Sequence, residues 1–320
     1  MDLNAFYTVI IALFIMIIIG FIARKVGIIN EGISKALSSI VLKIGQPFMI
    51  IGALIGVDDL STERLASGFA VLGLGIAFHV VIALVAHFCV FKFKNVNERK
   101  ITEFAIIFGN CGFIGFPLVE SVMGAEGLFY ASFFLISFNI FMWTWGLAIL
   151  ARKREDIKLS PKTMVLNYGT LPCIIALSLY VIIFLVKLKF PDFAMPEYIA
   201  LPISYIGNLC TPISMLITGS LIATVSLKEL FCNLKVYYAC AIRLVVAPAI
   251  IVLLTWLFGL DKFIVFMGIV FAMPTASGTV MFGELYEIEK KRAAVICGVS
   301  SLLSMLTMPL LMYLLSIIFV

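Results

Sequence analysis

Residues 109–117 read GNCGFIGFP, and they interrupt an otherwise apolar segment with three glycines, one asparagine and one proline. Glycine tolerates unwound backbone, and proline removes a helical hydrogen bond. Within a lipid bilayer, such a break in a helix is stable only where it is buried in protein or lines a wet cavity. The stretch therefore predicts a discontinuous membrane helix at a functional position.

A second stretch of the same kind lies in the other half of the chain. Residues 271–278 read FAMPTASG, with small residues and hydroxyls close to Pro274. Paired interrupted segments at corresponding positions of two halves indicate the binding site of a secondary transporter. The alternative is two kinked helices that bind no ligand.

The composition is that of an integral membrane protein. Hydrophobic residues make up 63% of the 320 residues, charged residues make up 13%, and the mean hydropathy is +1.17. Soluble domains are nearer about 45–50% apolar, so we expect much of the surface to face membrane lipid. The net charge of +5 does not indicate nucleic acid binding, because the basic residues fall in short loops between apolar segments.

Ten apolar segments are long enough to cross a membrane, which takes about 20 residues. The first has no basic residues before it and is too long for a signal-peptide core, so we interpret it as a span. The predicted spans cover residues 4–23, 33–56, 65–91, 102–122, 126–150, 164–187, 198–223, 236–258, 263–284 and 293–319. The expected fold class is an all-α integral membrane protein with ten transmembrane helices, of which the fourth and ninth are broken.

Basic residues are divided unevenly between the loops. Of the 23 lysines and arginines, 17 fall in the odd-numbered loops, four fall on the opposite side, and Lys43 and Arg243 lie within spans. Cytoplasmic loops carry the excess of basic residues. We therefore expect a multi-pass protein of the cytoplasmic membrane with both termini on the extracytoplasmic side.

Two halves of five spans each would enter the membrane in opposite orientations, because five is odd. Residues 1–150 and 164–320 are predicted to be two such inverted repeats, joined by a short cytoplasmic linker at 151–163. Gln46-Pro47 in the second span and Thr211-Pro212 in the seventh occupy matching positions. Crossing of the two broken helices would bring four helix ends near the midplane, where their partial charges can hold ions or polar groups.

The two interrupted stretches carry the main candidate site residues. Asn110 offers both a hydrogen-bond donor and an acceptor, and the neighbouring glycines expose backbone groups beside it. Pro274 suits the first turn of a helix, and the hydroxyls of Thr275 and Ser277 follow it. The alternative is that both hydroxyls bond back to their own helix.

Arg243 lies about eight residues into the eighth span, hence about 12 Å deep at 1.5 Å per residue. A central arginine costs about 2.5–3.5 kcal/mol on insertion scales, whereas a helix end returns at most about 2 kcal/mol. The side chain therefore needs an anion or water, unless it extends to the cytoplasmic surface or pairs with Glu103 or Glu120. Lys43 raises the same question, and its counterpart in the other repeat is the neutral Asn208.

The remaining polar residues form no recognisable catalytic or metal-binding set. Acidic residues are scarce within the spans, which argues against a proton antiporter built on a midplane pair of aspartates. His79 and His87 are predicted to pack between helices rather than to relay protons. Asn139 is expected to neighbour the pocket. The seven cysteines include no Cys-x-x-Cys motif, so we expect no disulfide framework, no metal site and no cofactor.

At these positions the sequence resembles the auxin efflux carrier family, which includes the plant PIN-type carriers and bacterial relatives described as malate or malonate permeases. The resemblance runs through residues 110–124, 242–248 and 273–276, and continues to Glu284 and Tyr286. It implies the crossover fold shared with bile-acid sodium symporters, in which spans one, two, six and seven form a scaffold and the others form a mobile transport domain. It also implies an organic-anion substrate between these parts, and a scaffold that pairs as a homodimer.

Together these features predict a secondary transporter that moves an organic anion, either an auxin-like carboxylate or a dicarboxylate, by alternating access, with coupling to sodium or protons left open. A cation-coupled antiporter on the same fold and a membrane receptor or sensor are the alternatives. An enzyme is not expected, because the sequence has no His-Glu-x-x-His motif, acidic metal-binding cluster or nucleophile elbow. The candidate substrate-binding residues are Asn110, Cys111, Gly112, Pro117, Asn139, Arg243, Pro274, Thr275 and Ser277, with Lys43, Gln46, Asn208 and Thr211 on the scaffold side.

Overall fold

The computed structural model describes residues 3–55, 61–152, 171–190, 192–226 and 232–318. Over these residues the secondary structure is helical, apart from an isolated β-bridge between Gly109 and Thr275. Seven helices in the described ranges are long and apolar enough to cross a membrane. The expectation of an all-helical, multi-pass membrane protein is therefore confirmed, whereas the count of ten spans and the inverted repeat stay predictions.

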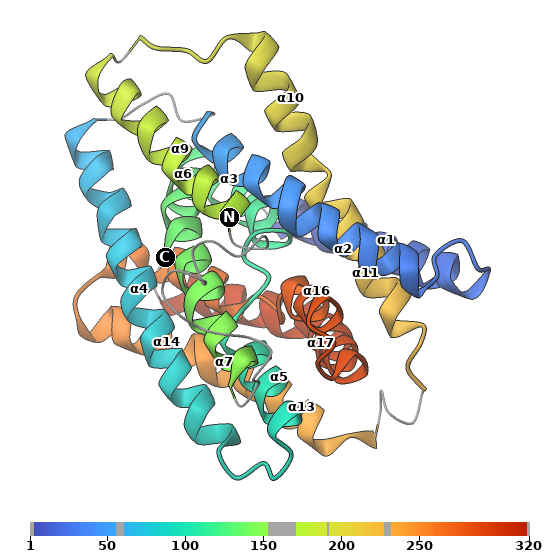
Figure 1. Ribbon diagram of the computed structural model, residues 1–320. Helices are drawn as coiled ribbons and strands as arrows, with labels where there is room; N and C mark the ends of the chain where they lie inside the picture. Colours follow the sequence, from blue (N-terminus) through green and yellow to red (C-terminus); the bar gives the residue numbers. More distant parts are fainter. Residues whose placement is uncertain (1–2, 56–60, 153–170, 191, 227–231, 319–320) are drawn as a thin grey trace.

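Helices occupy most of the described chain (Figure 1). Wide π-type turns, named η1, η2 and η3, occur within three of the longer helical stretches. Two of these turns, η1 and η3, contain Lys43 and Arg243, the charged residues that the sequence places within spans. Turns of this type are rare and often lie at functional sites. In chain order the elements are α1 (Leu3–Lys25), α2 (Glu31–Ile40), η1 (Val41–Gly45), α3 (Gln46–Ile55), α4 (Thr62–Val90), α5 (Val96–Ile107), α6 (Gly115–Phe141), η2 (Met142–Gly146), α7 (Leu147–Ala151), α9 (Leu171–Lys189), α10 (Glu197–Asn208), α11 (Cys210–Ile222), α13 (Leu234–Ala241), η3 (Ile242–Val246), α14 (Ala247–Leu257), α15 (Asp261–Ala272), α16 (Ser277–Leu285) and α17 (Lys290–Ile318).

Both stretches that are rich in small residues and proline interrupt helices. Residues 108–114 separate α5 from α6, and residues 273–276 separate α15 from α16. The predicted boundary between the fourth and fifth spans, at residues 122–126, coincides with a kink at Gly124, where the two helices that make up α6 meet. The helix turns at Gly124, whose φ of 58° and ψ of −142° suit only glycine. A single glycine therefore stands where we expected a short loop.

Helix contacts are extensive within two groups of helices, and the groups also touch each other where α1 packs on α6 and α11 packs on α17. In the first, α1 packs along α11, and α3 packs against α9 and α10. These helices correspond to the four spans that we predict to form a scaffold. In the second, α4 packs on α6 and α14 packs on α15. Both unwound segments belong to this second group, and its division from the first as a mobile domain stays a prediction.

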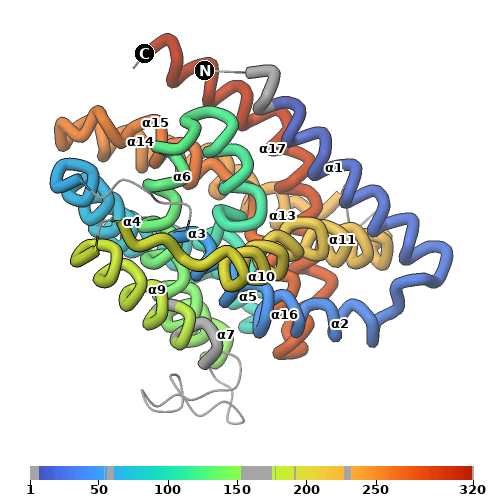
Figure 2. Tube along the Cα trace, turned by 90° about the horizontal axis from the view of Figure 1, so that it is seen from above, coloured from blue at the N-terminus to red at the C-terminus, as the bar shows by residue number. Residues whose placement is uncertain are grey.

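The start of α1 and the end of α17 lie at the same end of the molecule (Figure 2). An even number of membrane crossings requires such an arrangement. Most of the predicted cytoplasmic linker, residues 153–163, lies outside the described residues.

The contact between α1 and α11 depends on glycine at both helices. A Cβ on Gly219 would overlap the carbonyl oxygen of Ile17, and a Cβ on Gly20 would overlap that of Leu216. A backbone carbonyl cannot rotate away as a side chain can, so the two helices would have to move apart.

We expect Gly219→Ala to destabilise the protein by about 1–3 kcal/mol, the usual cost of overpacking. Gly73→Ala on α4 is the matched control, because its Cβ would meet no atom within 4 Å and alanine favours a helix. Thermal unfolding of the two purified variants in detergent measures the difference. Equal unfolding temperatures would contradict the close approach of α1 and α11.

Candidate functional site

The two unwound segments pair with each other through an antiparallel bridge between Gly109 and Thr275. On one side of this bridge, the Asn110 N–H donates to the carbonyl of Pro274 at 2.8 Å. On the other side, the Ala276 N–H donates to the carbonyl of Phe108 at 2.9 Å. Backbone groups that the helices leave free thus bond to each other, as buried backbone in a membrane must.

Four helix ends meet at this pairing. α6 and α16 begin there, and α5 and α15 end there. A helix start carries partial positive charge on its free N–H groups, and a helix end carries partial negative charge on its free carbonyls. The helix starts therefore favour an anion, and the helix ends favour a cation.

Asn110 links the two interrupted helices through its side chain. Its Nδ2 donates to Ser277 Oγ at 2.9 Å, and the Thr218 hydroxyl oxygen on α11 lies 3.3 Å from the same Oγ. Ser277 therefore bonds across the break rather than back to its own helix. Thr275 faces another way, because its hydroxyl donates to the carbonyl of Ala105 on α5 at 3.1 Å.

A second polar pair joins α3 to α6. Gln46 Nε2 donates to Asn139 Oδ1 at 2.6 Å, and both side chains are buried. The Gln46 Oε1 is buried without a hydrogen-bond partner. On α11, Thr211 donates to the carbonyl of Phe113 at 3.0 Å. Residues of the predicted scaffold thus bond both to α6 and to the unwound segment before it.

Arg243 binds the ends of both interrupted helices. Its side chain is enclosed, with 1% of the residue exposed. Nε donates to the carbonyl of Met273 at 2.9 Å, and Nη1 donates to the carbonyls of Ile106 and Ile107 at 3.2 Å each. These carbonyls belong to the C-terminal ends of α15 and α5, where a cation is favoured. The remaining Nη2 is buried without a partner and packs against Gly109, where a Cβ would overlap it.

This placement differs from two of the arrangements that the sequence allowed for Arg243. The guanidinium does not reach the surface, and no ion pair joins it to either glutamate. Glu103 bonds instead to Arg152 at 2.9 Å, and Glu120 lines the cavity described next. The Arg243 guanidinium is instead bonded to backbone carbonyls, which cannot be identified as its partners from the sequence.

A cavity of about 800 Å³ lies between α3, α6 and α10 and ends at the break. Much of its wall is apolar, and its charged residues are Arg64, Glu120 and Glu197. The candidate residues that line it are Gly112, Pro117, Asn208 and Thr211.

A much smaller void, of about 20 Å³, lies beyond the inner end of the cavity. Gln46 and Asn110 line it together with apolar residues, and Met49 and Gly112 line both spaces. A void of this size holds about one water molecule. The side chains of Gln46 and Asn110 thus line this void and not the cavity.

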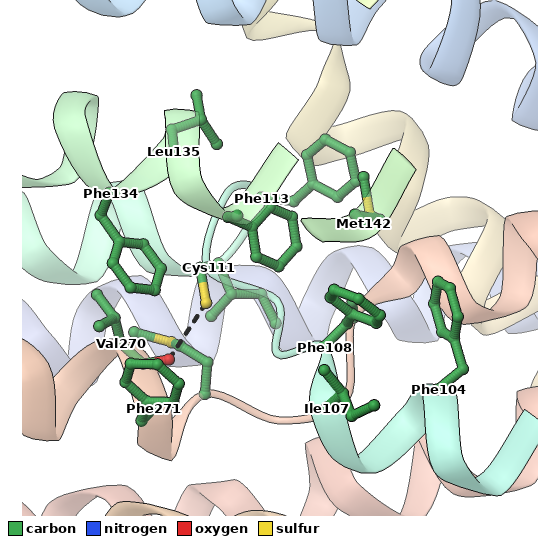
Figure 3. Close-up of a cluster of buried hydrophobic side chains, with 14 of the residues drawn as sticks. Phe104, Ile107, Phe108, Cys111, Phe113, Phe134, Leu135, Met142, Val270 and Phe271 are labelled. Atoms are coloured by element: carbon green, nitrogen blue, oxygen red, sulfur yellow. Dashed lines mark hydrogen bonds between the residues drawn. The ribbon is translucent and has the colours of Figure 1, made fainter. Parts of the chain in front are cut away.

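Other candidate residues line neither space. Cys111 is buried among aromatic side chains, and its Sγ lies 3.2 Å from the carbonyl of Val270 (Figure 3). Lys43 is half-buried in η1. Pro274 contributes its carbonyl to the pairing of the unwound segments.

Sequence reasoning missed the contributions of Met49, Arg64 and Glu197 to the cavity wall. Met49 lies three residues after Gln46, so helical spacing places the two on one face and could have identified it. Arg64 and Glu197 lie near the starts of α4 and α10, which only the folded arrangement brings to one cavity.

Comparison with known proteins shows what kind of membrane protein this is. Residues 5–167 and 163–312 match the family described as membrane transport protein. The chain belongs to this family. A protein of Methanocaldococcus jannaschii described as an uncharacterized transporter is 25% identical over 312 residues, which cover 94% of this chain and 96% of that protein. The resemblance to the auxin efflux carrier family is thereby confirmed, and the chain is a transporter with a small-molecule substrate.

We expect Arg243→Gln to lower the stability of the transporter by about 1–3 kcal/mol, because it leaves buried carbonyls at two helix ends without a donor. Arg243→Lys should recover part of the loss, since an ammonium keeps the charge but lacks the planar fork that reaches both helices. Thermal unfolding of the purified variants measures both effects, with Arg99→Gln as a control at a partly exposed arginine. Wild-type stability of Arg243→Gln would show that these contacts do not hold the break together.

Proposed function

We propose that this transporter carries an organic anion, in particular a carboxylate, by alternating access. The observation that supports it best is the positive character of the break. The helix starts of α6 and α16 meet there, and Arg243 Nη2 has no partner and packs against Gly109 on the wall of the void. Among the residues that the structure describes, no acidic one lines that void. Helix starts and an arginine both favour a carboxylate.

The cavity suits the rest of such a molecule. Its volume of about 800 Å³ falls within the range of about 300–1,000 Å³ that is usual for small-molecule sites. Phe48, Phe116 and Phe129 give it apolar walls, and its charged residues are Arg64 and the two carboxylates Glu120 and Glu197. The apolar walls suit the ring of an aromatic carboxylate such as an auxin-like acid, whereas a dicarboxylate would depend on Arg64 for its second carboxylate.

One end of the α2–α3 stretch borders the open cavity, whereas the other end is packed against α16. This difference supports alternating access. Ile55, at the end of α3, lines the cavity. At the opposite end of the stretch, α2 packs on α16. There Glu284 is buried, and its Oε2 accepts hydrogen bonds from Ser34 at 3.2 Å and from Ser38 at 3.3 Å.

Two exposed ion pairs flank this contact. Lys35 lies 3.2 Å from Glu287, and Lys290 lies 2.9 Å from Glu31. We call the whole set the α2–α16 latch, and it consists of Glu31, Ser34, Lys35, Ser38, Glu284, Glu287 and Lys290. In our proposal the structure is the state that is open at the cavity and closed at the latch, and transport requires the reverse state as well.

The remaining parts of the proposal follow the resemblance and the division of basic residues between loops. The scaffold of α1–α3 and α9–α11 is fixed and pairs as a homodimer, whereas α4–α7 and α13–α17 move. The protein lies in the cytoplasmic membrane with both termini outside, and sodium or protons are the candidate coupling ions. The anion is held by Asn110 and the helix starts from the moving side and by Gln46, Asn208 and Thr211 from the scaffold. Lys43, the fourth scaffold candidate, lines neither the cavity nor the void in this state.

We expect the purified transporter in proteoliposomes to take up a mono- or dicarboxylate, and the same compound to raise its unfolding temperature, because a ligand of the folded state stabilises it. Asn110→Ala should weaken binding by about 1–3 kcal/mol, the cost of leaving a buried partner unpaired. Asn233→Ala is the control, since that side chain makes no capping bond at the start of α13.

Each contrary outcome has a distinct meaning. Binding of a carboxylate without uptake would indicate a receptor. Sodium or proton flux that needs no organic substrate would indicate a cation antiporter. Either result, or unchanged binding in a folded Asn110→Ala variant, contradicts the proposal.

A further inference from the structure

Met49 occupies a position that the proposed function leaves unexplained. It lies on α3, one helical turn after Gln46, and it lines both the cavity of about 800 Å³ and the void of about 20 Å³. Of the described residues, Gly112 is the other one that lines both. The side chain of Met49 and the backbone at Gly112 therefore form the partition between the two spaces.

Both the methyl group and the backbone of Met49 are closely packed. A Cβ on Gly112 would lie 3.1 Å from Met49 Cε, so the methyl group rests against the unwound segment. A Cβ on Gly207 would lie 3.0 Å from Met49 Cα and 3.1 Å from its N, so the backbone of Met49 is closely packed on α10. The movable part is the side chain, which is unbranched and has three rotatable bonds.

The void behind this side chain is small and mostly apolar, and Gln46 and Asn110 are its polar lining. Gln46 is 2% exposed and its Oε1 has no partner, and Asn110 is 3% exposed. An unpaired buried acceptor is unfavourable, and Gln46 Oε1 gains a partner only when a water or a ligand donor reaches it. A space that holds about one water does not admit a carboxylate. Displacement of the Met49 side chain would join the void to the cavity.

We propose that Met49 determines the specificity of the transporter. Its side chain separates the void, with Gln46 and Asn110, from the cavity in this state and swings aside to admit one end of the anion, so the opening that it leaves limits the width of the anion. A narrow acid such as acetate requires a smaller displacement than a ring acid such as benzoate. The identity of the ligand rests on the proposed function, whereas the partition itself does not.

A cysteine at position 135 reports on the partition without any transport assay. Leu135 lines the void but not the cavity, and Leu135→Cys removes volume rather than adding it. The probe is a small methanethiosulfonate that carries an ethylammonium group. Peptide mass spectrometry follows its reaction in purified protein, with the exposed native Cys232 as the internal reference.

In the Leu135→Cys background, Met49→Ala should accelerate labelling at position 135 at least about tenfold, because truncation of a partly buried side chain opens a cavity. Met49→Leu should change the rate by less than about threefold, since it conserves most of the volume. Gly112→Ala should slow labelling, because its Cβ presses on the Met49 methyl group. Met16→Ala, at a half-buried methionine of α1, is the matched control.

An unchanged rate in Met49→Ala, with normal reaction of Cys232, overturns the proposal. Equal acceleration by Met16→Ala also overturns it, because general loosening would then explain the result. If Met49→Ala fails to fold, Gly112→Ala still tests the proposal. Labelling at position 135 that is as fast in Gly112→Ala as in the Leu135→Cys parent contradicts a partition between Met49 and Gly112.

The flux of acetate and benzoate in proteoliposomes separates this proposal from the proposed function. The benzoate-to-acetate flux ratio should rise at least about tenfold in Met49→Ala, which is within the range that pocket contacts give in discrimination. If labelling responds but wild-type protein transports no carboxylate, the proposed function fails and the partition stands. If carboxylates are transported but neither labelling nor the flux ratio responds, the partition is wrong and the proposed function stands.

Discussion

The pairing of two unwound backbone segments at Gly109 and Thr275 is the interaction on which the rest of the structure depends. A bilayer offers no water to unpaired backbone groups, and each such group costs several kcal/mol. Two helices can be interrupted side by side only if their free groups bond to each other or to side chains. Here backbone bonds of 2.8 and 2.9 Å, the hydroxyl of Thr275 and the guanidinium of Arg243 satisfy those groups.

This constraint accounts for residue types that have no obvious relation in the sequence. Gly109 lacks a side chain because Arg243 Nη2 occupies the space that a Cβ would need. Arg243 is stable far from water because its acceptors are carbonyls at helix ends, where positive charge is favoured. The start of α6 contributes Phe116 and Pro117 to the cavity wall. The arrangement that repairs the backbone therefore also directs a helix start towards the cavity, where our proposal places the anion.

The fold class and the two helix interruptions could be predicted from the sequence, because apolar length and the content of glycine and proline act locally. The partners of Arg243 could not be predicted, since they are backbone carbonyls that any residue would supply. Gln46 and Asn139 were both expected near the pocket, but they are 93 residues apart, and only tertiary packing brings them to 2.6 Å. Met49 was missed because an apolar residue on an apolar helix gives no signal until the spaces on its two sides are known.

Alternating access is the central claim, and distances across the two ends of the protein test it most directly. Spin labels at Ile33 and Lys291, which are exposed residues beside the α2–α16 latch, report on one end. Labels at Ala125 and Ala200 report on the cavity. Pulsed electron paramagnetic resonance should show that a transported carboxylate populates a state in which the first distance is longer and the second is shorter. A carboxylate that is transported while both distances stay unchanged, or while both change in the same direction, would contradict the account.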